Sequence, residues 1–519
     1  MKAQDYKISS EKFVFCATDE RIHDKKLETK PVTYFRDALN RFAKNKASIL
    51  AAIIIGILLL FAIVGPMLTP YSVAYEDVSY AYALPKNKIF YNLGIHFWDG
   101  GQEKEINKAT FELYRAIQEE TRRTVIMTEP EMVEQEYMGK KSQLYSFRLD
   151  TYNAVGVKFV LLTTAEYKAL QEYQDENQVQ VIFPITDPKL RPEADQDQEN
   201  ANYWFKTKVG PGLKTQIDYG PGGTFVPIYQ ANNGKDEYES KMYWEGEEKL
   251  YNYAEKKDGG MWKVRVDYRE YYIYQHAMAN DGAGDGIKEP LFILGANDVG
   301  KDLFACLASG ARFSFILSFL VAAVNLFVGA IYGSIEGYYG GKTDLIMERI
   351  VDLLASIPFM IVITLLKYHF NVSHVIILFI AFFLTGWTGM AGRTRMQFYR
   401  FKNQEYVLVA RTLGAKDSRI MFKHIFPNAI GTLITSSVLV IPGVIFSETS
   451  LSYLGIIDLN TGSMTSVGTL LAKGQNFLFT YPHMILFPAI FISLLMLCFN
   501  LFGNGLRDAF NPSLRGTED

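Results

Sequence analysis

Side chains that could perform chemistry are scattered in this sequence, and their spacing does not match a catalytic site. The run Gly341–Thr343 has the Gly-Lys-Thr ending of a phosphate-binding loop, but that motif needs a glycine where Glu336 stands. His369 and His374 are separated by a spacing that suits neither zinc binding nor a shared helix face. Because no nucleophile has a recognisable base, the sequence predicts a non-catalytic chain without a metal or a cofactor.

The cysteines and the charge exclude further classes of protein. Cys16, Cys306 and Cys498 are widely separated, and residues 72–290 contain no cysteine, so a disulfide framework is excluded there. The net charge of −3 and the mean hydropathy of +0.01 average very apolar runs with one long charged segment. Nothing in this pattern indicates nucleic-acid binding.

Apolar runs long enough to cross a membrane are the main organising feature. A bilayer core about 30 Å thick needs roughly 20 mostly apolar residues. Ser48–Leu68 meets this requirement without a charged residue, and the polar stretch before it favours an uncleaved anchor over a signal peptide. The other expected segments are Phe313–Ile335, Leu345–Leu366, Val375–Ala391, Ala429–Phe446 and Met484–Gly503. The segment Ala429–Phe446 is expected to be interrupted at Pro442-Gly443.

Lysines and arginines predict the orientation. Residues 1–48 carry 11 of them and residues 393–424 carry 8, whereas loops 367–373 and 451–482 carry only Lys367 and Lys473. Because basic loops stay in the cytoplasm, six crossings with both termini inside satisfy every loop. The predicted parts are a cytoplasmic segment 1–48, a first membrane helix 49–69, an extracellular segment 72–290, an outer segment 291–311, a five-helix membrane domain 312–508 with a cytoplasmic loop 393–428, and a cytoplasmic tail 509–519.

The segment 72–290 is too long and too patterned to be a linker. Val179–Phe183 and Trp262–Val266 alternate polar and apolar residues as strands do, and Thr164–Asn177 reads as a helix. Clusters of turn residues at 210–212, 220–223 and 281–285 separate such elements. We therefore predict a folded α+β domain. Its net charge of about −10 fits either an acidic, soluble surface or a docking surface for a partner.

The loop 393–428 contains the most informative motif. Glu405–Gly414 reads as a short amphipathic helix that a glycine ends, and a second helix then enters the membrane past Pro427. By itself, this pattern is typical of a solvated pair of cytoplasmic helices. However, Glu405, Ala410 and Gly414 match the EAA loop of ABC importer permeases, and the stretch resembles that loop although Val409 stands where the family usually has alanine.

Three further stretches resemble the C-type (OppC/DppC-like) permeases of oligopeptide and dipeptide importers, which belong to the binding-protein-dependent transport permeases. The first is 294–304 with Ser309–Arg312, where Ala305-Cys306 replaces the usual Ser-Arg pair. The second is Gly337–Asp344, with Arg349, Asp352 and Pro358 after it. The third is Glu448–Gly455 with 499–508 and Asn511-Pro512. The resemblance covers the first anchor and nearly all of residues 290–515.

This resemblance implies a type I ABC importer fold: an all-α polytopic domain of six membrane helices, here with the large inserted α+β domain. It also implies partners, namely a sister permease that completes a heterodimer, two ATP-binding subunits, an extracellular peptide-binding lipoprotein, the peptide substrate and membrane lipid. The implied location is a bacterial cytoplasmic membrane, and the implied mechanism is ATP-driven alternating access, with ATP hydrolysis in the partner subunits.

The same resemblance implies which residues act. Glu405, Tyr406, Ala410, Arg411 and Gly414 would form the element that docks on the ATPase, although Arg411 and Lys416 fit equally well as cytoplasmic charges that set the topology. Glu448, with Pro442 and Gly443, fits either a gating role or a structural role at a helix end.

Alternative functions remain open at this point. The same architecture could import a nickel chelate, an opine or a small glycan. A surface receptor or adhesion protein would act through residues 72–290, but it would not need an ATPase-docking loop. Typical C-type permeases have only a short loop in place of residues 72–290, so the resemblance does not cover this segment.

Overall fold

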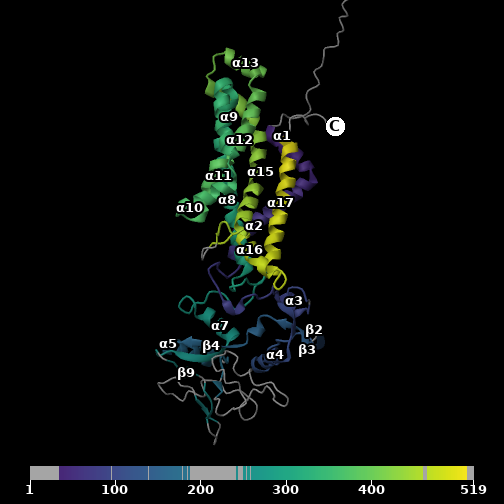
Figure 1. The fold of residues 1–519 in the computed structure, drawn as a ribbon, viewed down its shortest axis with the longest axis vertical. Helices are drawn as coiled ribbons and strands as arrows, with labels where there is room; N and C mark the ends of the chain where they lie inside the picture. Colours follow the sequence, from purple (N-terminus) through teal and green to yellow (C-terminus); the bar gives the residue numbers. More distant parts are fainter. Residues whose placement is uncertain are drawn as a thin grey trace, which may run out of the picture.

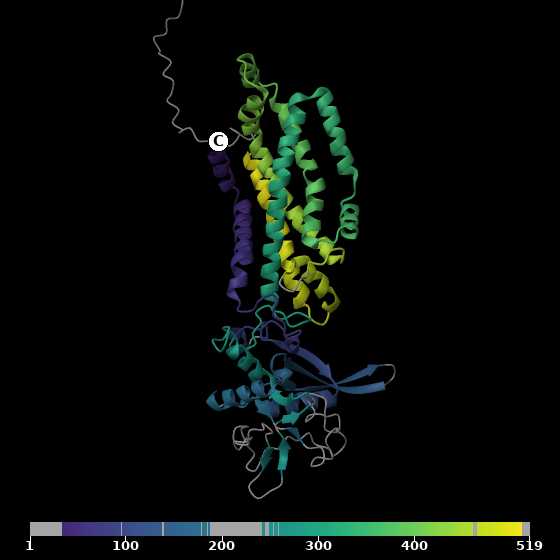
Figure 2. The ribbon, with the colours of Figure 1, turned by 90° about the vertical axis from the view of Figure 1, so that its left-hand side faces the viewer.

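The structure is a computed structural model, and it shows two parts at opposite ends of an elongated molecule. Long helices form one part, and shorter helices and strands from between α2 (Lys46–Leu68) and α8 (Leu303–Tyr339) form the other (Figures 1 and 2). The described residues are 34–94, 96–137, 140–177, 179–183, 185–186, 241–243, 249–252, 254–257, 259–459 and 464–510. The predicted turns at 210–212 and 220–223, most of segment 1–48 and most of tail 509–519 lie outside them.

The helical part contains the predicted membrane segments. In the described ranges, five helices are long and apolar enough to cross a membrane, or six if one bent pair counts as a single span. The single-element spans are α2, α8 and α17 (His483–Phe510). Two spans combine neighbouring elements, α11 (His374–Gly386) with α12 (Thr388–Phe401), and α14 (Asp417–Arg419) with η5 (Ile420–Ile425) and α15 (Phe426–Tyr453). Shorter helices are α1 (Tyr34–Lys44), α13 (Glu405–Thr412), α16 (Val467–Gly474) and η6 (Gln475–Phe477).

The predicted segment Leu345–Leu366 is not one straight helix, which corrects the expectation. It is divided into α9 (Gly341–Ser356) and α10 (Phe359–His369), which meet at an angle of 74°. The reason is Pro358, because a proline disfavours helical backbone in the residue before it, and Ile357 is extended (φ −79°, ψ 118°). The bent pair therefore has the geometry of either a broken span or a re-entrant loop.

The expected interruption at Pro442-Gly443 is wrong, because α15 runs without a break from Phe426 to Tyr453. Pro442 lies inside the helix and is buried. A proline removes one helical hydrogen bond, but neighbouring helices that surround it can hold the helix together. The local sequence therefore shows that Pro442 lacks a backbone N–H donor, but it does not show the helix packing that compensates for this loss.

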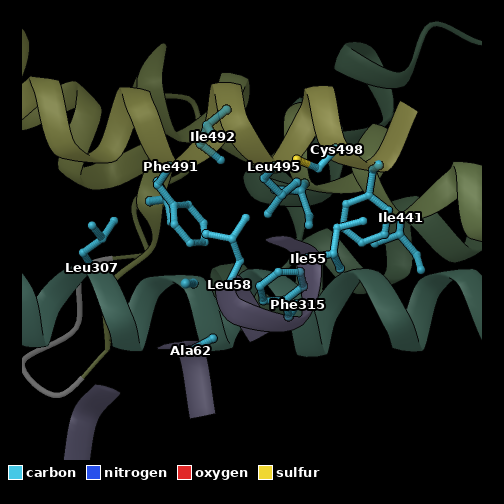
Figure 3. Close-up of a cluster of buried hydrophobic side chains, with 14 of the residues drawn as sticks. Ile55, Leu58, Ala62, Leu307, Phe315, Ile441, Phe491, Ile492, Leu495 and Cys498 are labelled. Atoms are coloured by element: carbon cyan, nitrogen blue, oxygen red, sulfur yellow. The ribbon is translucent and has the colours of Figure 1, made fainter. Parts of the chain in front are cut away.

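Apolar side chains from α2, α8, α15, α16 and α17 form the largest core of the membrane part. Figure 3 shows Ile55 and Leu58 of α2 and Phe315 of α8 pointing toward α17, which contributes Phe491 and Leu495. These side chains are at most 9% exposed. Burial of a side chain of this size contributes roughly 1.5–3 kcal/mol in water, whereas in lipid close packing is the main attraction between helices. The first helix is therefore packed into the bundle rather than attached to its outside.

Glycines bring α8 and α12 into close contact. Gly329, Gly333 and Gly337 are spaced four residues apart on α8, so they lie on one face of that helix. A Cβ at Gly337 would lie 2.7 Å from the Cβ of Phe398, and a Cβ at Gly333 would overlap the Ala391 carbonyl oxygen. Small residues at this spacing let two backbones approach each other, which is a common way of joining membrane helices.

The second part combines short helices with antiparallel strands. Its helices are α3 (Lys88–Asn92), α4 (Lys108–Thr121), α5 (Thr164–Asn177) and α7 (Tyr268–Met278), with η2 (Val78–Tyr80) and η3 (Asn153–Val155). Its strands are β1 (Gly101–Ile106), β2 (Glu131–Tyr137), β3 (Lys140–Asp150), β4 (Val157–Leu162), β5 (Ile182–Phe183), β6 (Ile185–Thr186), β7 (Lys241–Tyr243), β8 (Lys249–Asn252), β9 (Ala254–Lys256) and β10 (Trp262–Asp267). The sheet orders are β1-β3-β2, β4-β10-β5 with β9 beside β10, and β6-β8-β7.

Two of the predicted strands and the predicted helix of this part are present. Helix α5 has the predicted bounds, β10 covers the stretch from Trp262, and β5 covers the end of Val179–Phe183. Val264 and Val266 of β10 are fully buried with Val181 and Trp262 in one apolar cluster. The alternation of polar and apolar residues therefore predicts the strand from Trp262 correctly, whereas only the last two residues of Val179–Phe183 form a strand.

Aromatic residues join the α+β part to the first turns of α17 and the loop before it. Tyr82 stacks on Tyr481 with ring centroids 4.5 Å apart, and Trp98 stacks on Phe487 at 5.7 Å. The two ends of this part lie side by side: the Lys86 N–H, near its start, donates to the Phe292 carbonyl, near its end, at 3.0 Å. The α+β part is therefore an insertion whose two ends are adjacent.

Candidate functional site

The predicted docking element is a separate short helix at the end of the bundle far from the α+β part (Figure 1). Helix α13 begins at Glu405, after Gln404 takes an extended conformation (φ −72°, ψ 148°). Glu405 lies in the first turn and Arg411 in the last turn, so both charges are favourably placed in the field of the helix. Glu405, Tyr406 and Arg411 are exposed at the surface.

Gly414 ends this helix in the way that the motif predicts. Its φ of +77° is left-handed, a conformation that costs other residues energy but not glycine. The Gly414 N–H donates to the Arg411 carbonyl at 3.0 Å, and the Ala415 N–H donates to the Ala410 carbonyl at 3.1 Å. This pair of bonds is a Schellman motif, which satisfies carbonyls at a helix end and turns the chain sharply.

One face of α13 is buried against the next helix. Val407 and Ala410, three residues apart, are buried in a cluster with Ile420, Met421 and Ile425. The last three residues belong to η5, whose π-helical turns lead into α15. Pro427 follows directly and has no N–H for the Lys423 carbonyl, which explains why the regular hydrogen-bond register is lost there. Ala410 therefore acts as a small contact residue between two helices.

The other face of α13 is apolar and exposed. Tyr406, Leu408, Val409 and Leu413 are 40%, 46%, 55% and 82% exposed. Single exposed apolar residues are ordinary, but four on one eight-residue helix and its cap are more than a solvated helix needs, which is typical of a binding surface. The sequence analysis assigned no role to Leu408 and Leu413. Apolar residues on both faces of a short helix could have indicated that its second face binds a partner.

Charged side chains join α8, α9 and α12 to one another near the end of the bundle that carries α13. The Arg395 guanidinium on α12 binds the Asp344 carboxylate of α9 through Nε at 2.6 Å and Nη2 at 2.9 Å. It also lies 3.3 Å from Glu336 Oε1 of α8 and 3.5 Å from Glu348 Oε1. A two-pronged contact between arginine and carboxylate is geometrically specific, so α8, α9 and α12 are held in one arrangement.

A second set of contacts lies closer to α13. The Tyr338 hydroxyl donates to Asp417 Oδ1 at 2.6 Å, and the Arg411 guanidinium lies 5.8 Å from the centre of the Tyr338 ring. Lys402 Nζ donates to the Gly337 carbonyl at 2.9 Å. Sequence reasoning missed Tyr338, Asp417 and the Arg395 network, because their partners are distant in sequence and only the fold brings them together. Lys416 is exposed and precedes α14.

Glu448 lies away from this region, inside the bundle. It is fully buried on α15, and its carboxylate accepts bonds from the hydroxyls of Ser314 at 2.9 Å and Ser452 at 3.2 Å. Pro442 and Gly443 are one to two turns away on the same helix, and a Cβ at Gly443 would meet no atom within 4 Å. The structure does not bring these three residues together with Glu405–Gly414.

The motif at 294–304 is a turn that starts α8. The Asn297 side chain accepts from the N–H groups of Val299 at 3.1 Å and Lys301 at 2.8 Å. Asp302 caps α8 by accepting from the N–H of Phe304 and Ala305, and Thr69 Oγ1 donates to the same carboxylate at 2.9 Å. Gly300 is left-handed, and a Cβ there would overlap a backbone carbonyl. These residues therefore join the end of α2 to the start of α8.

Comparison with known proteins agrees with these motifs. The model of the family "binding-protein-dependent transport system inner membrane component" matches residues 325–516, and the model of the "N-terminal TM domain of oligopeptide transport permease C" matches residues 33–85. The oligopeptide transport system permease protein OppC of Bacillus subtilis is 43% identical over 221 residues, which are 43% of this chain and 72% of that protein. The dipeptide transport system permease protein DppC of the same organism is 38% identical over 222 residues, or 43% and 68%.

Among solved structures, an inward-facing MetNI methionine ABC transporter matches with a TM-score of 0.32 and 13% identity, covering 40% of this chain and 96% of that chain. The two family models lie on either side of the inserted α+β part and match both membrane regions. Together with the identity to OppC over most of its length, they show that this chain belongs to the OppC/DppC-type permeases of the binding-protein-dependent transport family, which have the type I ABC importer fold.

Proposed function

We propose that this chain is the permease subunit of an ABC importer that carries oligopeptides across a bacterial cytoplasmic membrane by alternating access. Its relatives are named for oligopeptide and dipeptide transport. The chain would pair with a sister permease, two ATP-binding subunits and an extracellular peptide-binding lipoprotein. ATP hydrolysis would take place in the ATP-binding subunits, so no catalytic residue is assigned here.

The exposed apolar face of α13 is the observation that best supports this proposal. We assign Glu405, Tyr406, Ala410, Arg411 and Gly414 to an ATPase-docking element, with Leu408 and Leu413 as its apolar contacts. Val407 and Ala410 of α13 share one apolar cluster with Tyr338 of α8 and Phe398 of α12, and the Arg411 guanidinium lies over the Tyr338 ring. A displacement of α13 would therefore move the bundle as well. A rigid connection of this kind lets an event outside the membrane change the arrangement of the helices.

The test is to purify the tagged chain from its native membrane together with whatever subunits remain bound. The variant pair Leu408→Asp and Leu413→Asp places charge on the exposed face of α13. Met132→Asp, at a side chain that is 68% exposed in the α+β part, is the matched control. The expected result is loss of the ATP-binding subunits from the α13 variant, with the sister permease retained. Retention of both ATP-binding subunits by the α13 variant would contradict the assignment.

We also propose that the insertion is an extracellular α+β domain that holds the lipoprotein over the entrance of the transport path, with both termini of the chain in the cytoplasm. The domain lies at the end of the bundle opposite α13, so docking of α13 in the cytoplasm would place it outside (Figure 2). The permease C model ends at residue 85, next to Lys86, where the insertion begins.

The adjacent ends of the insertion allow a clean deletion. Residues 88–290 can be replaced by a short glycine linker, because Lys86 and Phe292 are already joined by a hydrogen bond. We expect the shortened chain to assemble with its partner subunits but to bind the lipoprotein and take up peptide much less well. Recovery of the sister permease is the control for folding. Unchanged lipoprotein binding and uptake in an assembled complex would refute this role.

A further inference from the structure

A basic groove lies between α12, α15 and α17, away from α13 and Glu448. Its walls are Arg393, Gln397 and Arg400 of α12 and Arg507 and Phe510 of α17, and its floor is a stripe of α15. The floor residues are Thr432, Thr435, Ser436 and Leu439, which share one face of that helix. The cavity has a volume of about 370 Å³. A face this polar packs poorly against lipid chains, so it suits a polar occupant.

The three arginines of this groove have no anionic partner in the described part of the chain. None of Arg393, Arg400 and Arg507 forms an ion pair there, whereas Arg395 on the same helix contacts three carboxylates. Three guanidinium groups on one cavity create a strongly positive potential. The Gln397 Oε1 atom is also buried without a donor. These features suit an anion that also carries a hydroxyl group.

The depth of the groove can be taken from neighbouring contacts. Ser48, at the start of the apolar run of α2, donates to the Leu501 carbonyl of α17 at 3.2 Å, and a Cβ at Gly505 would overlap the Ser48 hydroxyl. Arg507 follows Gly505 by two residues, so it lies at the level of Lys46, where the apolar run begins. Arg393 is seven residues before Arg400, or about 10 Å deeper along α12.

We propose that this groove binds the headgroup of an anionic phospholipid of the same membrane leaflet, with a phosphate between the arginines and a headgroup hydroxyl on Gln397. Arginine pairs well with phosphate oxygens, and basic pockets between membrane helices on the cytoplasmic side hold anionic headgroups. The hydroxyls of Thr432, Thr435 and Ser436 supply further donors on the floor. Leu439 and Phe510 give the glycerol backbone and the first carbons of the acyl chains an apolar contact.

The experiment uses the full chain, purified with the subunits that stay bound, and native mass spectrometry. Phosphatidylglycerol and phosphatidylcholine with identical acyl chains are the two lipid probes, and inorganic phosphate is the third. The test variant carries Arg393→Gln, Arg400→Gln and Arg507→Gln. The control carries Arg36→Gln, Lys46→Gln and Lys423→Gln, three exposed cations outside the groove.

We expect the wild-type chain to retain phosphatidylglycerol in preference to phosphatidylcholine. Each lost arginine should weaken binding about fivefold, so the triple variant should bind phosphatidylglycerol about a hundredfold more weakly, whereas the control binds normally. Equal retention of the two lipids, or equal loss in the control, would overturn the proposal. Displacement of the lipid by inorganic phosphate would overturn it in favour of a free anion. A groove that excludes lipid in the assembled complex would overturn it in favour of a protein occupant.

Discussion

Replacing Gly414 by alanine should loosen the end of α13 without any steric clash. A Cβ at this position would meet no atom within 4 Å, so the entire cost comes from the left-handed backbone at φ +77°. That cost is about 1–2 kcal/mol for a residue with a Cβ. If the chain escapes the strain, the two bonds from the Gly414 and Ala415 N–H groups are lost instead. Either way, opening of this turn should become roughly 5–30 times more frequent.

Hydrogen exchange of the purified complex, read at peptides that cover residues 405–416, measures this opening directly. We expect faster exchange at Ala415 in Gly414→Ala, and less peptide transported per ATP hydrolysed. Gly414→Asn should lie between the wild type and the alanine variant, because asparagine tolerates the left-handed region better. Gly443→Ala is the control, since that glycine is helical and has open space around it. Equal exchange in the alanine, asparagine and control variants would refute the reasoning.

Three further predictions concern the junction before α8 and the buried carboxylate. Gly300→Ala should greatly reduce the yield of folded protein on size-exclusion chromatography, because its Cβ would overlap the Asp77 carbonyl. Gly286→Ala is the control: this glycine is also at positive φ but lies in open space, so the substitution should cost only about 1 kcal/mol of stability. Burial raises the pKa of the Asp302 carboxyl from 3.8 to about 6, so its stabilising effect is complete below about pH 4 and is lost as the pH rises through 6. Asp302→Asn should remove a pH dependence of about 3 kcal/mol from the free energy of unfolding. The variant should then show a smaller difference in thermal unfolding temperature between pH 4 and pH 8 than the wild type. The same dependence of unfolding on pH in both proteins would contradict this. Glu448→Gln should keep the contacts to its serine partners and retain transport. Glu448→Leu loses these contacts and should destabilise the bundle by about 1–3 kcal/mol. Equal thermal stability of the two variants would argue against a structural role.

The sequence predicts the membrane helices well because hydrophobic length is a local property. Every predicted segment lies within the observed spans, although Leu345–Leu366 is divided at Pro358. The observed spans are longer than the predicted ones, since α8 extends on both sides of Phe313–Ile335 with residues that pack on protein. Prediction from nearby residues alone fails for prolines: Pro358 divides a predicted segment, whereas Pro442 lies inside an unbroken helix. The difference depends on how neighbouring helices surround each residue.

The candidate site could be predicted only in part. The bounds of α13 and the left-handed Gly414 follow from the motif, because a capped short helix is determined by nearby residues. The partners of Arg395 are 47 to 59 residues away in the chain, and nothing in the local pattern indicates that Asp344, Glu348 and Glu336 converge on it. The roles of α13 and Glu448 stay predictions, and the variants at Leu408, Leu413, Gly414 and Glu448 test them.

The glycine contact between α8 and α12 has a mechanical consequence. With 37 residues, α8 is about 55 Å long, and it reaches from the base of the α+β part to the ion pairs of Arg395. Its close contact with α12 through Gly329, Gly333 and Gly337 makes the two helices one rigid unit. When a rigid unit of this length tilts slightly at one end, its other end is displaced. Under the proposed function, this helix pair would connect the α+β part mechanically to the end of the bundle that carries α13.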